Sequence, residues 1–441
     1  MNEVLTIALR LFIFAFFHFP IDKVGNKVYI IGRKTYNICR NKKSGDIMNT
    51  IYVDNAATTQ VSETALNAML PLLKETYGNP SSLHHIGQIA KEVLEDARAR
   101  VATCIGANPN EIYFTSCGTE ADNQAILSAA YTGAMKGKKH IISSKFEHHA
   151  VLHTLEKLKK EGFEITLLDV YKEGIVKVDD LKAALRDDTA LVTIMMANNE
   201  VGTIQPIKEL AAVCREKGVT FHTDAVQAAG HIKVDVNELG VDMLSVSGHK
   251  FHGPKGVGFL YCKKGVPLQV FMNGGAQERN RRAGTENMAG ICGLTAALEE
   301  ACANLDKNAA HITAMRNRII DGVKDIELCS INGDLEKRLP GTVNMCFEGI
   351  EGEGLILLLD QKGICTSSGS ACTSGSLDPS HVLLAMGVPV ESAHGSLRIS
   401  LSEYNTEEEA DFIVESIHEV VTYLRSISPV WEKIQKGEVV E

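Results

Sequence analysis

The chain lacks the excess of positive charge that marks nucleic-acid-binding proteins. Its 441 residues include 45 lysines and arginines against 55 aspartates and glutamates, which gives a net charge of -10. Because phosphate backbones are bound by clustered basic residues, nucleic acid is not expected as a partner. The P-loop spacing G-x-x-x-x-G-K-[ST] is missing from both turns that could bind phosphate, at 116–119 and 253–258. A small metabolite is therefore the expected ligand.

Paired cysteines are missing as well. The eleven cysteines include no C-x-x-C pair, so a zinc site is not expected, and their odd number is typical of a reducing compartment. We therefore predict a cytoplasmic protein. Most of the cysteines lie in apolar runs, where a buried thiol acts as a small hydrophobic side chain. Cys372 is the exception, because it lies among serines and glycines.

No apolar run is long enough to make a membrane span the preferred interpretation. The candidate run, 7–19, is interrupted by Arg10 and His18 and lacks a small-residue cleavage site. It lies within residues 1–47, which hold eight lysines and arginines against three acidic residues. We interpret 1–47 as an atypical extension that is disordered. Alternatively, it results from an incorrectly assigned upstream start codon, and translation begins at Met48. A signal peptide or membrane anchor is the alternative.

From Met48 onward, apolar strand-like runs alternate with amphipathic helical ones, which is typical of an α/β fold around a largely parallel sheet. No internal repeat or low-complexity stretch interrupts this pattern. The seven expected strands are 111–115, 140–144, 163–170, 190–197, 219–224, 241–247 and 256–262. The expected helices between and after them are 122–135, 150–160, 179–186, 207–217 and 285–305.

The alternation changes after about residue 306. A helix is expected first, then strands near Ile326 and Thr342, a helix over 353–361 and a terminal helix over 406–426. We therefore predict a large domain, 63–305, and a smaller α+β domain formed by 48–62 and 306–441.

Two polar residues lie where the strands of an open α/β sheet bind ligands, beyond their carboxyl ends. Asp224 ends an apolar strand and could pair with a protonated ring nitrogen, although alone it could equally be a helix N-cap. Lys250 lies in a turn of small residues, where burial and nearby positive charge favour Schiff-base chemistry. A solvated surface lysine is the alternative for Lys250, and the surrounding glycines argue against it.

Other motifs complete this pattern. Ser116-Cys117-Gly118-Thr119 ends a strand and opens a helix, whose free amides would bind an anion. Ser247 and His249 could also donate to a phosphate. Glu147-His148-His149 follows another strand, so that an imidazole could stack on a cofactor and move protons; a metal pair or a surface pair is the alternative.

These motifs, in this order, resemble the group I cysteine desulfurases of the NifS/IscS type, within the class V aminotransferases. The similarity runs from about Tyr52 to Leu424. Its motifs are 54–59 (DNAATT), 118–120 (GTE), 147–148 (EH), 198–202 (NNEVG), 224–227 (DAVQ), 247–250 (SGHK) and 370–374 (SACTS).

The resemblance implies a pyridoxal-phosphate-dependent transferase of fold type I and a role for each matched residue. Lys250 would hold the cofactor covalently, His148 would stack on its ring, and Arg398 would bind the substrate carboxylate. Asn199 would position both substrate and cofactor. The implied cofactor-binding residues are Gly118, Thr119, His148, Asn199, Asp224, Gln227, Ser247, His249, Lys250 and, from a neighbouring subunit, Thr285.

The implied reaction converts L-cysteine to L-alanine and leaves the sulfur on Cys372 as a persulfide. The catalytic residues would be Cys372, Lys250 and His148, and small neighbours would let Cys372 carry sulfur outward. The resemblance also implies a homodimer and an iron-sulfur scaffold protein of the IscU/NifU type as sulfur acceptor. Cys372 would then be a transient iron-sulfur ligand through its persulfide.

Three features depart from the family pattern. The extension 1–47 has no recognised counterpart, His149 replaces a frequent lysine, and Cys117 replaces a common glycine. The alternatives within enzymes are a selenocysteine lyase or another pyridoxal phosphate enzyme of the same fold, such as an aminotransferase. A non-catalytic scaffold that binds a partner through 429–441 is the alternative from a different class.

Overall fold

The computed structural model describes residues 50–368 and 379–437. The extension 1–47 and Cys372 lie outside these residues. The part from Asn49 onward forms one compact unit. None of the described helices is long and apolar enough to cross a membrane.

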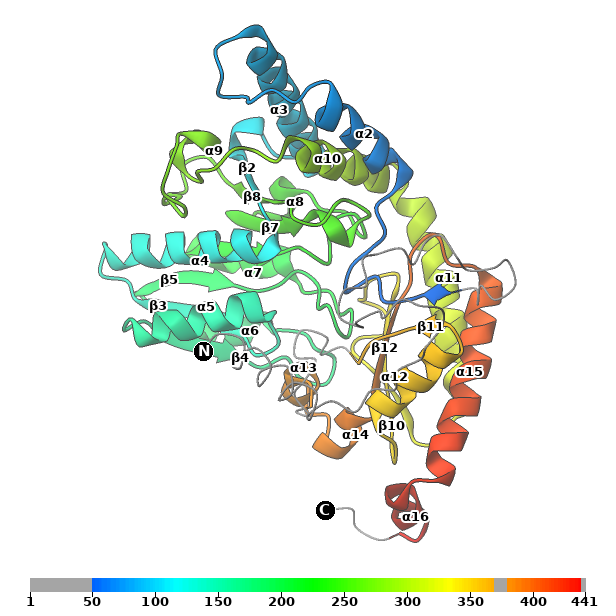
Figure 1. Ribbon diagram of the computed structural model, residues 1–441. Coiled ribbons are helices and arrows are strands. Elements are labelled where there is room, and N and C mark those ends of the chain that lie inside the picture. The colour runs from blue at the N-terminus through cyan, green and yellow to red at the C-terminus, as the bar shows by residue number, and fades with distance from the viewer. Residues whose placement is uncertain (1–49, 369–378, 438–441) are drawn as a thin grey trace, which may run out of the picture. The chain divides into compact units, whose positions relative to one another are not determined.

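A seven-stranded sheet is the centre of this unit (Figure 1), in the strand order β2-β8-β7-β6-β5-β3-β4. All pairs between β7 and β4 are parallel, whereas β8 is antiparallel to both of its neighbours. The prediction of a mostly parallel seven-stranded sheet is therefore confirmed. The strands are β2 (Ile112–Thr115), β3 (His140–Ser144), β4 (Glu164–Leu168), β5 (Thr189–Thr193), β6 (Thr220–Asp224), β7 (Met243–Ser247) and β8 (Gly258–Cys262).

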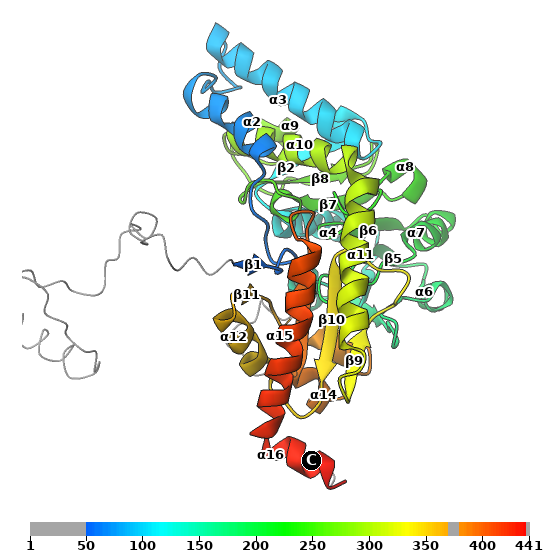
Figure 2. The same ribbon diagram turned by 90° about the vertical axis from the view of Figure 1, so that its right-hand side faces the viewer.

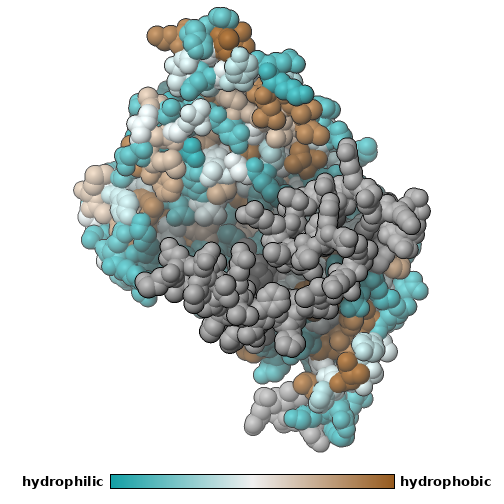
Figure 3. All heavy atoms as spheres, viewed as in Figure 1, coloured by the Kyte–Doolittle hydropathy of each residue, from teal (hydrophilic) through white to brown (hydrophobic). Residues whose placement is uncertain are grey.

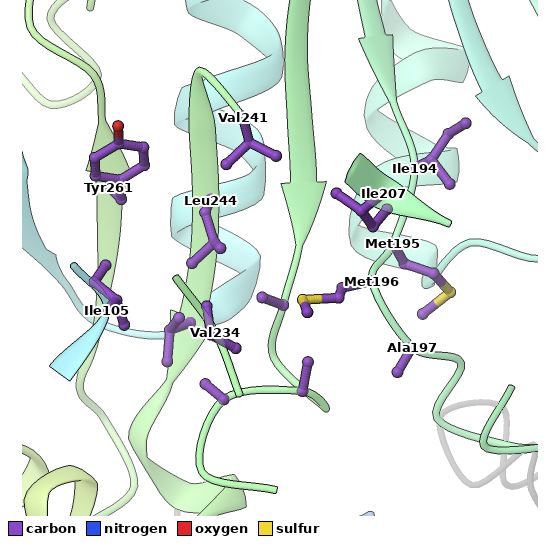
Figure 4. Close-up of a cluster of buried hydrophobic side chains, with 14 of the residues drawn as sticks. Ile105, Ile194, Met195, Met196, Ala197, Ile207, Val234, Val241, Leu244 and Tyr261 are labelled. Carbon is purple, nitrogen blue, oxygen red and sulfur yellow. The ribbon is translucent and has the colours of Figure 1, made fainter. Parts of the chain in front are cut away.

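The helices cover both faces of this sheet because successive strand residues point to opposite faces and both sets are apolar. Ile141 belongs to the cluster under α4 and α5, whereas its neighbour Ile142 belongs to the cluster on the opposite face. Figure 4 shows part of that second cluster, where Leu244 and Val241 lie near Ile105 and Val234. The helices are α2 (Glu63–Lys74), α3 (His85–Cys104), α4 (Gly118–Ala134), α5 (His149–Lys160), α6 (Val178–Ala184), α7 (Ile207–Glu216), α8 (Val236–Leu239), α9 (Gln277–Asn280) and α10 (Met288–Ala303).

The predicted strand 190–197 is wrong at its C-terminal end, since β5 ends at Thr193. The backbone N–H of Met195 donates to the buried carboxylate of Glu147, at 2.9 Å, rather than to a neighbouring strand. The residues after Thr193 remain buried and apolar, so hydrophobicity alone could not place the end of the strand.

A second, antiparallel sheet has the strand order β12-β10-β9. Its apolar side chains form a cluster of their own with Ile51, Val53 and helices α11, α12 and α15, and α11 and α15 lie side by side along it (Figure 2). The elements are β1 (Ile51–Tyr52), α11 (Leu305–Val323), β9 (Cys329–Asn332), β10 (Thr342–Phe347), α12 (Gly352–Gln361), β11 (Ile364–Cys365), α13 (His381–Ala385), α14 (Val390–His394), β12 (Ser396–Ser400), α15 (Glu407–Ser426) and α16 (Pro429–Gln435). The division into two domains stays a prediction.

Candidate active site

A cavity of about 370 Å³ lies at the carboxyl ends of the central parallel strands. This is where open α/β sheets bind ligands. Ten of the predicted site residues line it: Gly118, Thr119, His148, Asn199, Asp224, Gln227, Ser247, His249, Lys250 and Arg398. The fold therefore brings together residues that lie up to 280 positions apart in the chain.

Lys250 lies in a short 3₁₀ turn, η2 (Gly248–Lys250), immediately after β7. Its half-buried ammonium group donates to the carbonyl oxygens of Ala56 and Ala57, at 2.6 and 2.9 Å. These two carbonyl groups orient the amine in the cavity. Such a lysine is placed to react with an aldehyde.

Asp224 is the last residue of β6, and its carboxyl group is buried. Oδ1 accepts a hydrogen bond from the backbone N–H of Val226 at 2.9 Å, which fixes the orientation of the carboxyl group. Burial raises the pKa of Asp224 above its ordinary value, against the opposing effects of Val226 and Lys250. A cationic N–H in the cavity would therefore be bound strongly, because it would supply a charge that this carboxylate needs.

Another part of the cavity wall, at Gly118 and Ser247, is suited to an anion. Gly118 is the first residue of the 17-residue helix α4, whose free backbone amides and positive dipole end lie at the cavity wall. Ser247 Oγ is buried there and has no hydrogen-bond partner among the described residues. A Cβ at position 118 would lie 2.5 Å from Val226 Cγ2, so glycine preserves this space.

His249 and His148 are neutral at physiological pH. Burial, followed by the charge of Lys250, lowers the pKa of each imidazole to about 4. His148 is the N-cap of α5, and its Nδ1 accepts from the backbone N–H of Ala150 at 3.1 Å. This assigns the ring proton to Nε2, which is then the atom that can donate into the cavity.

Arg398 lies in β12 of the antiparallel sheet and is 2% exposed. Its Nη1 donates to the carbonyl oxygen of Asn199 at 3.0 Å, and its Nη2 donates to Asp54 Oδ1 at 2.8 Å. Nε has no hydrogen-bond partner among the described residues. The guanidinium group is therefore held in place while still presenting donor capacity toward the cavity, as a carboxylate-binding site requires.

Thr285 does not line the cavity; it is exposed on the chain. Cys372 lies outside the described residues, but the chain on both sides of that segment is anchored near the cavity. Ser367 pairs through its backbone with Arg398, and Ser380 Oγ donates to the buried carboxylate of Glu200 at 2.5 Å. His381 Nε2 lies 3.1 Å from the carbonyl oxygen of Glu147.

Several residues of the site were not assigned a role from the sequence. Asp54 was noted only as part of a motif, and its pairing with Arg398 spans 344 positions, so no local pattern could have revealed it. Asp122 also lines the cavity, although its place inside a helix resembles that of an ordinary polar surface residue. The carbonyl groups of Ala56 and Ala57, which accept from Lys250, belong to the backbone, so the residue types at these positions could not indicate their role.

This set of groups fits pyridoxal phosphate. The amine of Lys250 suits the aldehyde, the buried carboxylate of Asp224 suits the ring nitrogen, and the start of α4 with the unpartnered Ser247 hydroxyl suits the phosphate. Among the described residues no cluster of histidine, cysteine or acidic side chains could hold a metal ion.

Comparisons with known proteins agree with this geometry. The family model for aminotransferase class-V matches residues 51–413. A cysteine desulfurase IscS from Methanosarcina thermophila is 51% identical over 395 residues, which cover 90% of this chain and 98% of that protein. Two solved structures are also similar. A NifS-like protein has a TM-score of 0.80 at 41% identity and covers 85% of this chain and 100% of its own. SspA in complex with cysteine has a TM-score of 0.72 at 35% identity, and the match covers 81% of this chain and 100% of SspA.

The matched regions include every cavity-lining residue named above. The predicted family and its dependence on pyridoxal phosphate are therefore confirmed. The chain belongs to the class-V aminotransferase family and, within it, to the cysteine desulfurases.

Proposed function

We propose that this chain converts L-cysteine to L-alanine and transfers the sulfur to Cys372 as a persulfide. The observation that carries the proposal is that one cavity holds Lys250, Asp224 and Arg398 together. An amine, a buried carboxylate and a guanidinium group are the three groups needed to hold an aldehyde cofactor and an amino acid side by side.

Arg398 binds the substrate carboxylate, with Asn199 beside it, and this places the α-carbon near Lys250. Pyridoxal phosphate, held by Lys250, Asp224, Gln227 and the phosphate-binding residues, acts as the electron sink when bound. The amine of Lys250 would take the α-proton of the bound substrate. His148 is neutral and protonated at Nε2, so its Nε2–H donates a hydrogen bond toward the reacting groups, and it is the candidate proton carrier of the site.

The sulfur-transfer step balances without an external oxidant. The Cys372 thiolate attacks the sulfur of the substrate, the carbon–sulfur bond of the substrate breaks, and its electron pair stays with the carbon fragment. Protonation of that fragment gives alanine, while a sulfur–sulfur bond now joins the transferred atom to Cys372. The outer sulfur atom of the persulfide is then transferred to an acceptor thiolate, which leaves Cys372 as a thiolate again.

We also propose the assembly and partners that such a reaction needs. Thr285, exposed on its own chain, would complete the cavity of a second copy in a homodimer. The apolar surface of α2, with Leu66, Leu70 and Leu73 exposed, supports such an association (Figure 3). The sulfur acceptor would be an iron-sulfur scaffold protein of the IscU/NifU type, with Cys372 as a transient cluster ligand. Action in the cytoplasm belongs to the same proposal.

The test is to quantify alanine and sulfide formed from L-cysteine, with a reductant present, by the wild type, Cys372→Ser and Lys250→Ala. We expect equal amounts of both products from the wild type and none from either variant. Alanine formed from L-cysteine by Cys372→Ser would contradict sulfur transfer through Cys372. L-selenocysteine, used in parallel, distinguishes the lyase alternative, because that activity would persist in Cys372→Ser.

A further inference from the structure

Asp122 is a buried carboxyl group that the reaction proposed above does not use. It lies in α4, lines the same cavity as Asp224 and is 1% exposed. Its Oδ1 has no hydrogen-bond partner among the described residues. An ionised carboxylate buried in this way would be costly, so the charge state of Asp122 needs an explanation.

The surroundings of Asp122 disfavour its ionised form. Burial raises its pKa well above the ordinary value, and the charge of Asp224 raises it further. A hydrogen bond with Ser245 opposes these effects, whereas Glu147 and Cys117 add to them. The cations Lys250 and Arg398 line the same cavity. Lys250 lowers the pKa of Asp224, and Arg398 is bonded to Asp54 and to the Asn199 carbonyl.

His222 does not supply the missing positive charge, although its Nε2 lies 3.7 Å from Asp122 Oδ1. Burial lowers the pKa of His222 to about 3, so the imidazole is neutral and the pair is not a salt bridge. Its two ring nitrogens instead contact two hydroxyl groups. Nδ1 lies 2.8 Å from Thr193 Oγ1, and Nε2 lies 2.9 Å from Ser245 Oγ.

Together with the hydrogen bond between Ser245 and Asp122, these contacts form a buried relay from Thr193 through His222 and Ser245 to Asp122. A neutral imidazole has one N–H and one acceptor nitrogen, so the two hydroxyl groups must take opposite roles. In one direction Thr193 donates to His222, which donates to Ser245, which donates to an ionised Asp122. In the other direction a protonated Asp122 donates to Ser245, which donates to His222, which donates to Thr193. The relay can therefore accommodate either protonation state of Asp122.

We propose that Asp122 is a positioning residue of the cofactor site, which holds the single proton shared by the Asp122 and Asp224 carboxyl groups. Ionisation of two buried carboxyl groups at one cavity is disfavoured, and the relay gives the Asp122 proton an acceptor in Ser245. Asp224 is thereby kept ionised, as it would need to be in order to pair with the ring nitrogen of pyridoxal phosphate. The role of an ionised Asp224 toward the cofactor rests on the proposed function, whereas the location of the proton on Asp122 does not.

Infrared difference spectroscopy of the cofactor-free protein locates the proton directly. At about pH 8, above the raised pKa of Asp224, Asp122→Asn should lose a protonated-carboxyl band that Asp224→Asn retains. Glu147 is also buried, with a pKa raised by burial to about 8, so Glu147→Gln identifies its separate band. A band lost in Asp224→Asn and kept in Asp122→Asn would overturn the proposal, as would the absence of any band assigned to Asp122. Should Asp122→Asn not fold, retention of an aspartate band in Asp224→Asn, labelled with ¹³C-carboxyl aspartate, decides the same point.

Titration of each variant with pyridoxal phosphate, followed by absorbance, tests the consequence for the cofactor. Asparagine at 122 imitates the protonated acid, so Asp122→Asn should raise the dissociation constant less than Asp224→Asn does. Asp224→Asn should weaken binding by about 10- to 100-fold, because it removes a charged acceptor. Equal weakening by both variants would contradict the proposal. A wild type that binds no pyridoxal phosphate would overturn the proposed function, while the infrared result would still decide where the proton lies.

Discussion

The two sheets contribute to the cavity in different ways. The seven-stranded sheet supplies residues at or just after its strand ends. Asp224 and His148 are oriented by bonds to the near neighbours Val226 and Ala150. Lys250 is instead oriented by the carbonyl groups of Ala56 and Ala57, which lie 194 and 193 positions away. The antiparallel sheet supplies Arg398 from within a strand, and its guanidinium group is held by residues 199 and 344 positions away. The orientation of Asp224 and His148 is thus encoded locally, whereas the side-chain contacts of Lys250 and of Arg398 depend on the complete fold.

The largest effect should come from the turn after β7. Lys250→Ala removes the amine that holds the aldehyde and takes the α-proton, so kcat should fall by about 10³-fold or more. The absorbance band of the covalently held cofactor should also disappear. Lys250→Arg, which keeps the charge but is not a nucleophile, should match Lys250→Ala. Substantial turnover by either variant would contradict the assignment.

A core substitution in the antiparallel sheet should affect stability instead. Leu397 is fully buried in β12, next to Arg398. Leu397→Ala should lower the free energy of unfolding by about 2–5 kcal/mol, measured by urea denaturation, because it removes buried methyl groups and leaves a cavity. Leu357→Ala, at a side chain that is 63% exposed, is the matched control and should change it by less than about 0.5 kcal/mol.

Arg398 itself separates substrate binding from cofactor binding. Arg398→Lys keeps the charge but loses the planar fork, so the KM for L-cysteine should rise by about 10- to 100-fold while the cofactor absorbance remains. Arg425→Lys is the control, since Arg425 is also largely buried but donates to the Glu348 carbonyl outside the cavity. Loss of the cofactor band in Arg398→Lys would contradict the division of roles between the two sheets.

The smallest effect should be a pH dependence of stability from a contact between the two regions. His252 follows Lys250, and its Nε2 lies 3.2 Å from Glu403 Oε2 without hydrogen-bond geometry, so we treat the pair as electrostatic. Burial lowers the pKa of His252, but Glu403 outweighs burial and the net pKa is raised. The His252–Glu403 pair therefore contributes to the free energy of unfolding below the ordinary histidine pKa, and this contribution is lost as the pH rises through the raised pKa of His252.

The effect of this contact on stability can be measured by comparing the free energies of unfolding of the wild type and His252→Gln, from urea denaturation at several pH values. We expect the wild type to be more stable by about 1 kcal/mol near pH 6 and the difference to shrink toward pH 9. Glu403→Gln should remove the same pH dependence. A difference that grows with pH would show that the sign is wrong.

The sequence predicted the seven strands well because their apolar runs are buried on both faces. It also predicted residues that line one cavity, because several of them lie at strand ends, and their roles toward the cofactor stay predictions. The end of β5 was missed, since the bond from Met195 to Glu147 is tertiary. Helices α2 and α3 were not predicted. Asp122 was overlooked because its carboxyl group differs from a surface one only through the buried contacts of Ser245 and His222, which come from other strands.

The most direct test of the central claim is mass spectrometry of the peptide that contains Cys372, after the cofactor-loaded protein reacts with L-cysteine without a reductant. We expect one additional sulfur atom on Cys372 in the wild type, accompanied by one alanine, and no such addition in Lys250→Ala. Alanine formation with an unmodified Cys372, or with the added sulfur on another cysteine, would contradict the account.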